Sequence, residues 1–154
     1  MTAYCLDTSA LAKRYARETG TAWILSPTDP ASGHDLYSVR LTGPEVVATL
    51  FRKARGGQIT LAQARHATAN FRVDWQHQYQ IVEVTPCVAE RAMALAEQYG
   101  LRGYDAVHVA AALELQDLRR ALHLPALTFV TADEEQLQAA TAEGLLTANP
   151  HTYP

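Results

Sequence analysis

The sequence predicts an α/β fold, a three-layer α/β/α sandwich with a mostly parallel central sheet. Short apolar segments, typical of buried strands, alternate along the chain with longer segments whose apolar residues recur at helical spacing. Such alternation places parallel strands between two layers of helices. The chain has 154 residues, of which 48% are hydrophobic, which is enough for a substantial buried core. We therefore expect residues 1–154 to form a single domain.

The first elements are a strand and a helical segment. The apolar run "AYCLDTS" (3–9) predicts a buried strand that ends at Asp7. The segment "ALAKRYARETGTAWIL" (10–25) has helical apolar spacing, which Gly20 interrupts. Residues 26–35 are polar and contain prolines, so we expect a loop that leads to the next strand.

The middle of the chain predicts two strands with two helices between them. "DLYSVR" (35–40) is the first strand. "GPEVVATLFRKARGG" (43–57) predicts a helix, because Pro44 suits its first turn and two glycines follow its end. Residues 60–78 predict another helix, and "YQIVEVT" (79–85) predicts the next strand.

The last third predicts three helices and two strands. Residues 86–100 and 104–122 have helical spacing, and the first of these helices ends at a glycine. The second is apolar nearly all round, which indicates a buried helix. Residues 126–144 predict a strand and then a helix, and "LLTANP" (145–150) predicts a last short strand.

Composition excludes several classes of protein. The net charge of −3 argues against charge-driven coating of nucleic acid, which needs a strongly basic surface. Cys5 and Cys87 form no C-x-x-C pair, so redox and zinc sites are not expected, and Cys5 should be a buried free thiol. The chain has neither an apolar run of membrane-helix length nor a recognisable secretory signal, so we expect a cytoplasmic protein that does not enter the membrane.

Two of the predicted strands end in the same way. Asp7 and Asp133 each follow an apolar strand and precede a helix. In open parallel sheets, ligands bind beyond the carboxyl ends of the strands. Both carboxylates therefore point into one crevice if their strands are neighbours. The alternative is that each aspartate only caps the helix that follows it.

Glu45 and Asp105 each lie in the first turn of a predicted apolar helix. The helix dipole favours an acidic residue there, so the position of Glu45 alone is weak evidence of function. Asp105 is more informative, because the helix behind it is buried and its N-terminus should face the interior or a cleft. Helix capping and a chemical role both remain open for Asp105.

Carboxylates that share one crevice repel each other. Two unit charges about 4 Å apart repel by about 4 kcal/mol at an effective dielectric of about 20. Such a site must therefore be protonated or hold cations. Hard oxygen ligands favour Mg²⁺ or Mn²⁺, and these ions support metal-assisted phosphoryl chemistry.

Four segments carry a resemblance to a known family: "YCLDTSALAKRY", "LTGPEVVATLFRK", "LRGYDAVHVAAAL" and "TFVTADEEQLQAA". In this order and at about these spacings they resemble the PIN-domain nucleases. Among these, the chain is similar to the VapC-type toxins of type II toxin–antitoxin systems. The resemblance covers nearly the whole chain and implies a PIN-like α/β/α fold.

The resemblance also implies a function, a metal-dependent endoribonuclease that arrests translation. It implies that Asp7, Glu45, Asp105 and Asp133 are the catalytic acids and the ligands of Mg²⁺ (or Mn²⁺), the last often acting through water. The implied partners are an RNA substrate, a second copy of the chain in a homodimer, and a cognate VapB-like antitoxin. The antitoxin tail would insert into the acidic groove, where an Arg or Lys supplies positive charge.

Small polar residues next to these acids have two interpretations. Thr8, Ser9 and Thr131 match small hydroxyl positions near such a site, and equally suit strand ends and helix caps. Glu134 and Glu135 follow Asp133 directly, and they fit a negatively charged first helical turn better than additional site acids.

The histidines predict no zinc site, because none of them forms an H-x-x-x-H or similar pair. His108 lies three residues after Asp105 on the same helix face, so a role as ligand or general base is open. A hydrogen-bonded core histidine is the simpler expectation. The sequence also lacks P-loop, G-x-G-x-x-G and G-x-S-x-G motifs, so neither a nucleotide cofactor nor a serine hydrolase is expected.

Basic and aromatic residues of the chain suggest RNA binding or packing. Two basic clusters either flank a groove and hold RNA phosphates or form solvated helix faces: Lys13, Arg14, Arg17, Arg52, Lys53 and Arg55. Three aromatic residues fall at helical core spacing and are expected to pack rather than to stack on bases: Trp23, Phe71 and Trp75.

Two other functions share part of this pattern of acids. A PIN module that binds RNA or a partner without cleaving is disfavoured, because it gains nothing from gathering several like charges. A Mg²⁺ phosphatase or receiver-type domain also places an Asp after its first strand. However, "LDTSA" lacks the second Asp of the D-x-D pattern, and no suitably placed active-site Lys follows.

Overall fold

The computed structural model describes residues 2–153 and confirms the predicted α/β fold. A five-stranded sheet has the order β3-β2-β1-β4-β5, and every neighbouring pair is parallel. The strands are β1 (Ala3–Leu6), β2 (Asp35–Val39), β3 (Gln80–Val82), β4 (Leu127–Val130) and β5 (Leu146–Ala148). Receiver domains have the order 2-1-3-4-5, so this topology argues against the receiver-type alternative.

Helices connect the strands. They are α1 (Thr8–Tyr15), α2 (Thr21–Leu25), α3 (Thr42–Arg55), α4 (Leu61–His77), α5 (Pro86–Tyr99), α6 (Gly103–Ala121) and α7 (Glu134–Ala142). Two short 3₁₀ turns are η1 (Pro30–Ser32) and η2 (Pro150–Thr152). Within the described residues, no helix is both long and apolar enough to cross a membrane.

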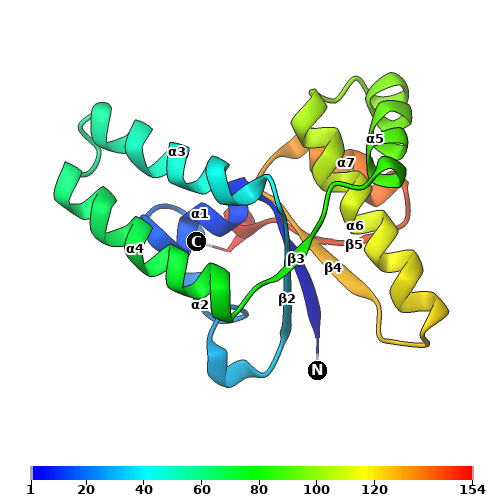
Figure 1. The fold of residues 1–154 in the computed structure, drawn as a ribbon, viewed down its shortest axis with the longest axis horizontal. Coiled ribbons are helices and arrows are strands. Elements are labelled where there is room, and N and C mark those ends of the chain that lie inside the picture. The colour runs from blue at the N-terminus through cyan, green and yellow to red at the C-terminus, as the bar shows by residue number, and fades with distance from the viewer. Residues whose placement is uncertain (1, 154) are drawn as a thin grey trace.

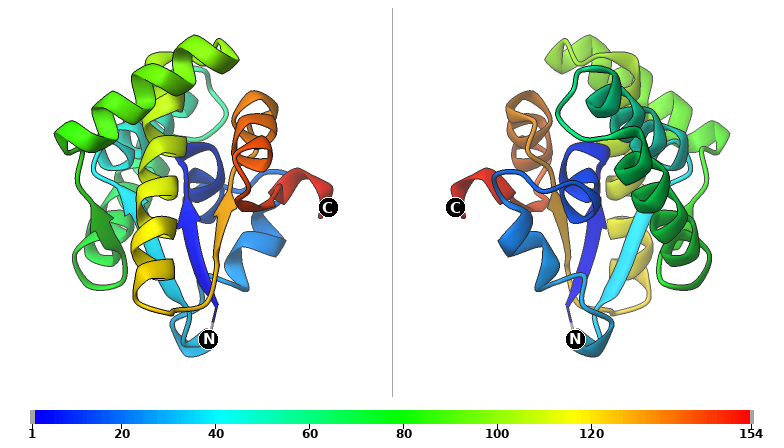
Figure 2. Two further views of the ribbon diagram at one scale, coloured as in Figure 1. Left: turned by 90° about the vertical axis from the view of Figure 1, so that its right-hand side faces the viewer. Right: turned by 90° about the vertical axis from the view of Figure 1, so that its left-hand side faces the viewer.

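The sheet separates two apolar cores, because successive strand residues point to opposite faces. Ala3, Cys5 and Phe129 face α5, α6 and α7, whereas Leu6 and Val130 face α1 to α4. Figure 1 shows the two helix layers on either side of the sheet, and Figure 2 shows the same layers from the sides. Cys5 is buried and free, as expected, and burial raises the pKa of its thiol to about 12.

The predicted helical segment over residues 10–25 starts two residues too late. It is divided into α1 and α2, and α1 begins at Thr8, two residues before the expected start. The earlier start follows from Asp7, whose carboxylate caps the helix by accepting from the Ala10 N–H. Gly20, with a φ of 90°, is the N-cap residue before α2, which agrees with the expected break. The predicted loop over 26–35 contains the turn η1.

Candidate active site

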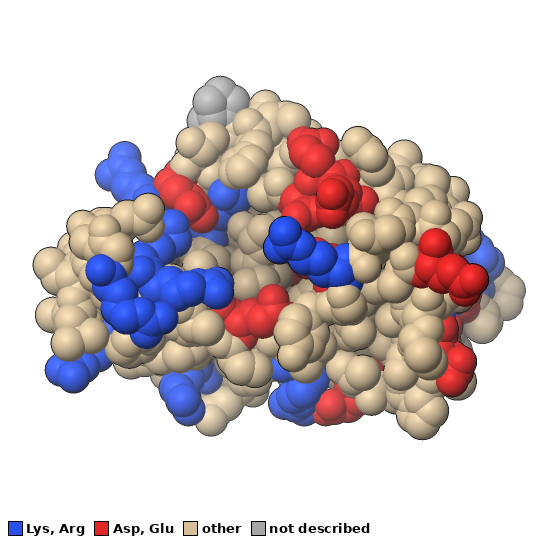
Figure 3. Space-filling view, turned by 90° about the horizontal axis from the view of Figure 1, so that it is seen from above, with Lys and Arg blue, Asp and Glu red and all other residues tan. Residues whose placement is uncertain are grey.

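One cavity of about 430 Å³ brings the four sequence-predicted acids together. Asp7, Glu45, Asp105 and Asp133 all line it. Asp7 and Asp133 follow β1 and β4, which are neighbours, so the condition for a shared crevice at the carboxyl ends of the strands is met. Figure 3 looks onto this end of the molecule and shows a hollow with acidic side chains on one side and basic side chains on another.

Asp7 is the most enclosed of the acids, with 1% of its surface exposed. Its Oδ1 accepts from the Ala10 N–H at 2.9 Å and from the Ser9 hydroxyl at 2.8 Å. Its Oδ2 accepts from the Thr131 hydroxyl at 2.9 Å and from Nε2 of Gln136 at 3.0 Å. Asp7 therefore caps α1, as one interpretation predicted, and also lines the cavity.

Asp133 also combines both roles at the start of α7. Its Oδ1 accepts from the Gln136 N–H at 2.9 Å and caps the helix, while the residue lines the cavity. The Thr131 hydroxyl accepts from the Asp133 N–H at 3.0 Å, so Thr131 ties the ends of β1 and β4 together. This contact explains why a small hydroxyl residue lies there.

Glu45 is positioned by two other elements. The Thr8 hydroxyl donates to its Oε2 at 2.9 Å, and Nε2 of His108 lies 3.1 Å from its Oε1. His108 is buried, as the core interpretation predicted, but it lines the cavity and contacts a site acid. His108 is thus part of the candidate site and links α6 to α3.

Asp105 does not cap α6. Arg102 occupies the N-cap position, and Asp105 lies in the first turn with its Oδ1 3.3 Å from Nε2 of Gln136. Helix capping is therefore the wrong explanation for this carboxylate. Its surroundings are the cavity and the Gln136 amide.

Gln136 is the site residue that the sequence interpretation missed. It is 3% exposed, and its Nε2 donates to both Asp7 and Asp105, so one amide bridges two carboxylates. Its Oε1 is buried without a hydrogen-bond partner among the described residues. The only signal in the sequence was its position three residues after Asp133, on the first turn of an amphipathic helix.

Burial is the main influence on the pKa values of Asp7 and Asp105 in the cavity. Burial raises the pKa of Asp7, although the charge of His108 and hydrogen bonds from Ala10, Ser9 and Thr131 oppose this shift. Burial also raises the pKa of Asp105, and the charge of Asp133 adds to the effect. Two carboxyl groups therefore hold protons more tightly than they do in water.

The pKa values of Glu45 and His108 shift in the directions expected for an ion pair. Burial opposes ionisation of Glu45, but hydrogen bonds from His108 and Thr8 and the charge of His108 lower its pKa overall. Burial also opposes a charged His108, yet the hydrogen bond to Glu45 and the charge of Asp7 raise its pKa overall. The neighbouring acids thus favour the protonated form of the His108 imidazole.

A protein-family model matches most of this chain. The PIN domain model matches residues 4–142, which includes all four acids. The chain belongs to the PIN-domain family. Within it, the chain is of the VapC type: it is 35% identical over 111 residues to ribonuclease VapC45 of Mycobacterium tuberculosis, covering 72% of this chain and 75% of that protein.

Solved structures of low sequence identity share the PIN fold. A toxin–antitoxin complex from Klebsiella pneumoniae matches with a TM-score of 0.62 at 20% identity, covering 96% of this chain and 97% of the other. PAE2754 from Pyrobaculum aerophilum matches with a TM-score of 0.61 at 21% identity, covering 95% of this chain and 89% of the other. The fold class and the family resemblance predicted from the sequence are therefore confirmed.

The donor atoms in the PIN cavity suit a hard divalent cation, because they are carboxylate oxygens. Within residues 2–153, no group of three or more His, Cys, Asp or Glu side chains is placed to hold one ion. The Asp7 oxygens accept instead from Ser9, Thr131 and Gln136. Burial raises the pKa of Asp7 and of Asp105, and a bound cation would favour the ionised form of both carboxylates.

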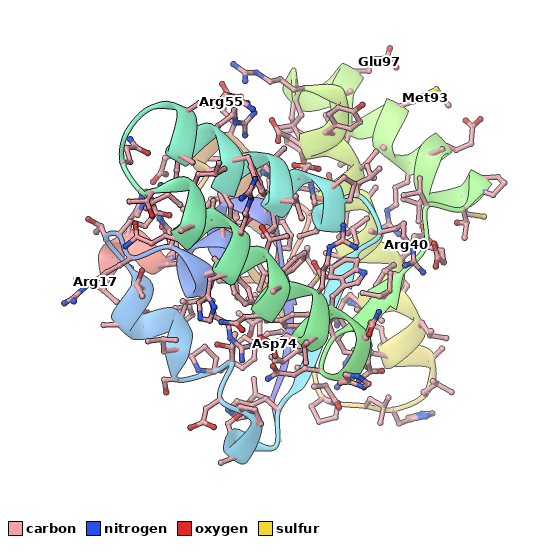
Figure 4. The ribbon with its side chains drawn as sticks, turned by 60° about the vertical axis from the view of Figure 1, so that its left-hand side comes forward. Arg17, Arg40, Arg55, Asp74, Met93 and Glu97 are labelled. Carbon is pink, nitrogen blue, oxygen red and sulfur yellow. The ribbon has the colours of Figure 1, made fainter. Side chains whose placement is uncertain are left out.

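The predicted basic clusters divide into two groups in this PIN domain. Lys13, Arg52 and Lys53 line the cavity. Arg14 instead donates to Gln78 and Tyr79, Arg17 points outward at the edge of the molecule in Figure 4, and Arg55 does not line the cavity. Only the first group is placed to meet a ligand of the acidic site.

The remaining predictions concern packing. Phe71 is buried, and Trp23 and Trp75 pack against the same apolar core, as expected. Glu134 and Glu135 lie in the exposed first turn of α7, and Glu134 accepts from Asn149, which agrees with the helix-turn interpretation.

Proposed function

We propose that this PIN domain is a metal-dependent endoribonuclease that acts as the toxin of a toxin–antitoxin pair. The observation that carries the proposal is the meeting of Asp7, Glu45, Asp105 and Asp133 in one cavity at the carboxyl ends of the sheet. Similarity to a named ribonuclease supports RNA as the substrate. Since toxins of this kind act on cellular RNA, we propose a cytoplasmic location.

In this proposal the four acids hold Mg²⁺ or Mn²⁺. Such an ion neutralises charge on the scissile phosphodiester and makes water a better nucleophile near neutral pH. Gln136 keeps Asp7 and Asp105 at a fixed spacing through its amide. His108 and Thr8 hold Glu45 in place and compensate its charge. The protein thus supplies fixed oxygen donors and a neighbouring source of positive charge.

The proposal predicts cleavage of RNA in Mg²⁺ or Mn²⁺ and none in excess EDTA. Because the ion binds only the folded cavity, Mg²⁺ at about a hundred times its dissociation constant should add about 2.7 kcal/mol to the free energy of unfolding. Cleavage is measured on gels with end-labelled RNA, and stability by thermal unfolding.

The same assay separates the alternatives. Cleavage that persists after complete chelation would contradict metal dependence. RNA binding without cleavage in any divalent cation would favour the non-cleaving module.

An added cognate antitoxin should stop cleavage at a stoichiometric dose. We propose that an Arg or Lys of a VapB-like antitoxin pairs with the cavity carboxylates, since it supplies the missing positive charge. Continued cleavage in excess antitoxin would contradict that part.

We also propose a homodimer, in which a second copy covers an apolar groove of about 600 Å³ between α5 and the start of α6. Met93 and Tyr104 line this groove and are 58% and 68% exposed. They can enter the same groove on a second copy, so the patch is self-complementary, as a two-fold interface requires. Glu97 and Arg102 supply opposite charges for the interface; in Figure 4, Met93 and Glu97 point away from the body of the molecule.

The dimer is tested with Met93→Glu, which places a charge in the groove. We expect twice the chain mass for the wild type and the single-chain mass for the variant, measured by size exclusion with light scattering. Leu118→Glu is the matched control, because Leu118 is 56% exposed and does not line the groove. A Met93→Glu variant that stays dimeric, or a wild type that is monomeric at high concentration, would rule out this interface.

A further inference from the structure

A second cluster of charged groups lies in the same cavity as the acids. Nζ of Lys13 lies 2.8 Å from Nε2 of His151 and 3.3 Å from Oε1 of Glu18. Nζ of Lys53 lies 3.0 Å from Oε2 of the same Glu18. All four residues line the cavity. They come from α1, the connection after it, α3 and the C-terminal turn.

This cluster has more positive than negative charge. Lys13 and Lys53 share one carboxylate, and Arg52 lines the cavity beside them. Lys13 is only 3% exposed. An ammonium group has three N–H donors, and Glu18 and His151 occupy two of those of Lys13. A buried ammonium held in this way is oriented rather than freely rotating, and it faces the cavity.

The C-terminal turn η2 is docked so that His151 reaches Lys13. Tyr153 stacks on Trp23 with ring centroids 5.0 Å apart, and Asn149 donates to Glu134 on α7 at 3.1 Å. Gly20 allows the approach, because a Cβ there would lie 2.7 Å from the Pro150 oxygen. Figure 2 shows the turn beside α2. The position of His151 is therefore fixed by packing.

We propose that this cluster is a binding subsite for an RNA phosphate adjacent to the one that is cleaved. Lys13 and Lys53 contact the phosphate, and Glu18 and His151 are positioning residues that hold the two ammonium groups. This proposal rests on the proposed function, since it gives a role in RNA binding to the basic side of the same cavity. An anionic polymer that crosses the cavity meets cations at this wall and the metal-binding acids at the other.

The test compares steady-state cleavage by the wild type with that by Lys13→Met and His151→Ala. We expect KM to rise about tenfold for Lys13→Met, because a charge-assisted contact to phosphate is lost, with kcat nearly unchanged. His151→Ala should raise KM about threefold, and His151→Gln should restore it, because an amide oxygen also accepts from an ammonium group. His151 is exposed, so its variants should fold even if Lys13→Met does not.

Salt dependence distinguishes a phosphate contact from a merely structural role. Binding of a labelled single-stranded RNA is measured in the Asp105→Asn background at several salt concentrations. Lys13→Met should lower the slope of log affinity against log salt by about 0.7, the value for one phosphate contact on a single strand. His151→Ala should leave the slope unchanged, because both ammonium groups remain. Arg17→Met is the matched control and should change neither quantity.

The outcomes separate this inference from the proposed function. If the wild type cleaves RNA while Lys13→Met changes neither KM nor the salt slope and His151→Ala leaves KM unchanged, the subsite is wrong and the ribonuclease stands. If RNA binds without cleavage and the slope falls in Lys13→Met, the subsite stands and the nuclease proposal fails. A chain that neither binds nor cleaves RNA would overturn both.

Discussion

The Asp105→Asn variant is expected to lose RNA cleavage by roughly 10²–10³-fold while it keeps its fold. Asparagine has almost the same size as aspartate but lacks the negative charge that a divalent cation requires. Asp105 is not the N-cap of α6, so the start of the helix does not depend on its carboxylate. Cleavage rates and circular dichroism spectra of purified protein test both parts.

The same variant should be more stable than the wild type when no divalent cation is present. Burial and the charge of Asp133 raise the pKa of Asp105, so the folded protein holds that proton more tightly than the unfolded chain does. The stabilisation is present below the ordinary pKa of an aspartate and is lost as pH rises through the raised value. At pH 7 the ionised carboxylate therefore lowers the unfolding free energy, and asparagine removes that effect.

Thermal unfolding in EDTA measures this difference. The midpoint of Asp105→Asn should exceed that of the wild type at pH 7, and the two should converge in acid. Mg²⁺ should reverse the order by stabilising the wild type. Asp117→Asn is the control on the same helix, because Asp117 is exposed and pairs with Arg91 and Arg120 outside the cavity. Full cleavage activity in folded Asp105→Asn would disprove the assigned role.

The Gln136→Glu variant is expected to lose roughly 3 kcal/mol of stability, an effect of about 10 °C in the unfolding midpoint. The amide nitrogen of Gln136 lies 3.0 Å from Asp7 and 3.3 Å from Asp105, so a carboxylate there would face two others. The substitution changes charge with almost no change in volume. The loss of stability in this variant therefore measures how strongly the cavity carboxylates repel an added negative charge.

Gln138→Glu provides the comparison, since it adds the same charge to an exposed position on the same helix. Its midpoint should stay within about 1 °C of the wild type. Mg²⁺ should restore part of the stability lost in Gln136→Glu, because a cation offsets the added carboxylate. Equal midpoints for the two variants would show that the Gln136 amide does not relieve repulsion between the acids.

Much of the fold could be predicted because local periodicity encodes it. Strands such as β1 and β4 are short apolar runs. The helical spacing of residues 104–122 predicted the start of α6 to within one residue. The break at Gly20 was also local, since a φ of 90° suits glycine. The start of α1 was misplaced because a cap depends on the side chain of Asp7, which periodicity does not report.

The sequence by itself indicated the α/β class, the parallel sheet and the placement of acids at element ends, because these follow from the periodicity of apolar residues and from the order of strands and helices along the chain. Only the tertiary structure decided that Gln136 bridges Asp7, 129 residues earlier, and that His151 meets Lys13 across 138 residues. Such contacts depend on how α7 and the C-terminal turn pack onto the sheet. The tertiary structure also decided that Asp105 faces the cavity and does not cap its helix. That choice depends on side-chain direction at the helix start, which residue spacing does not specify.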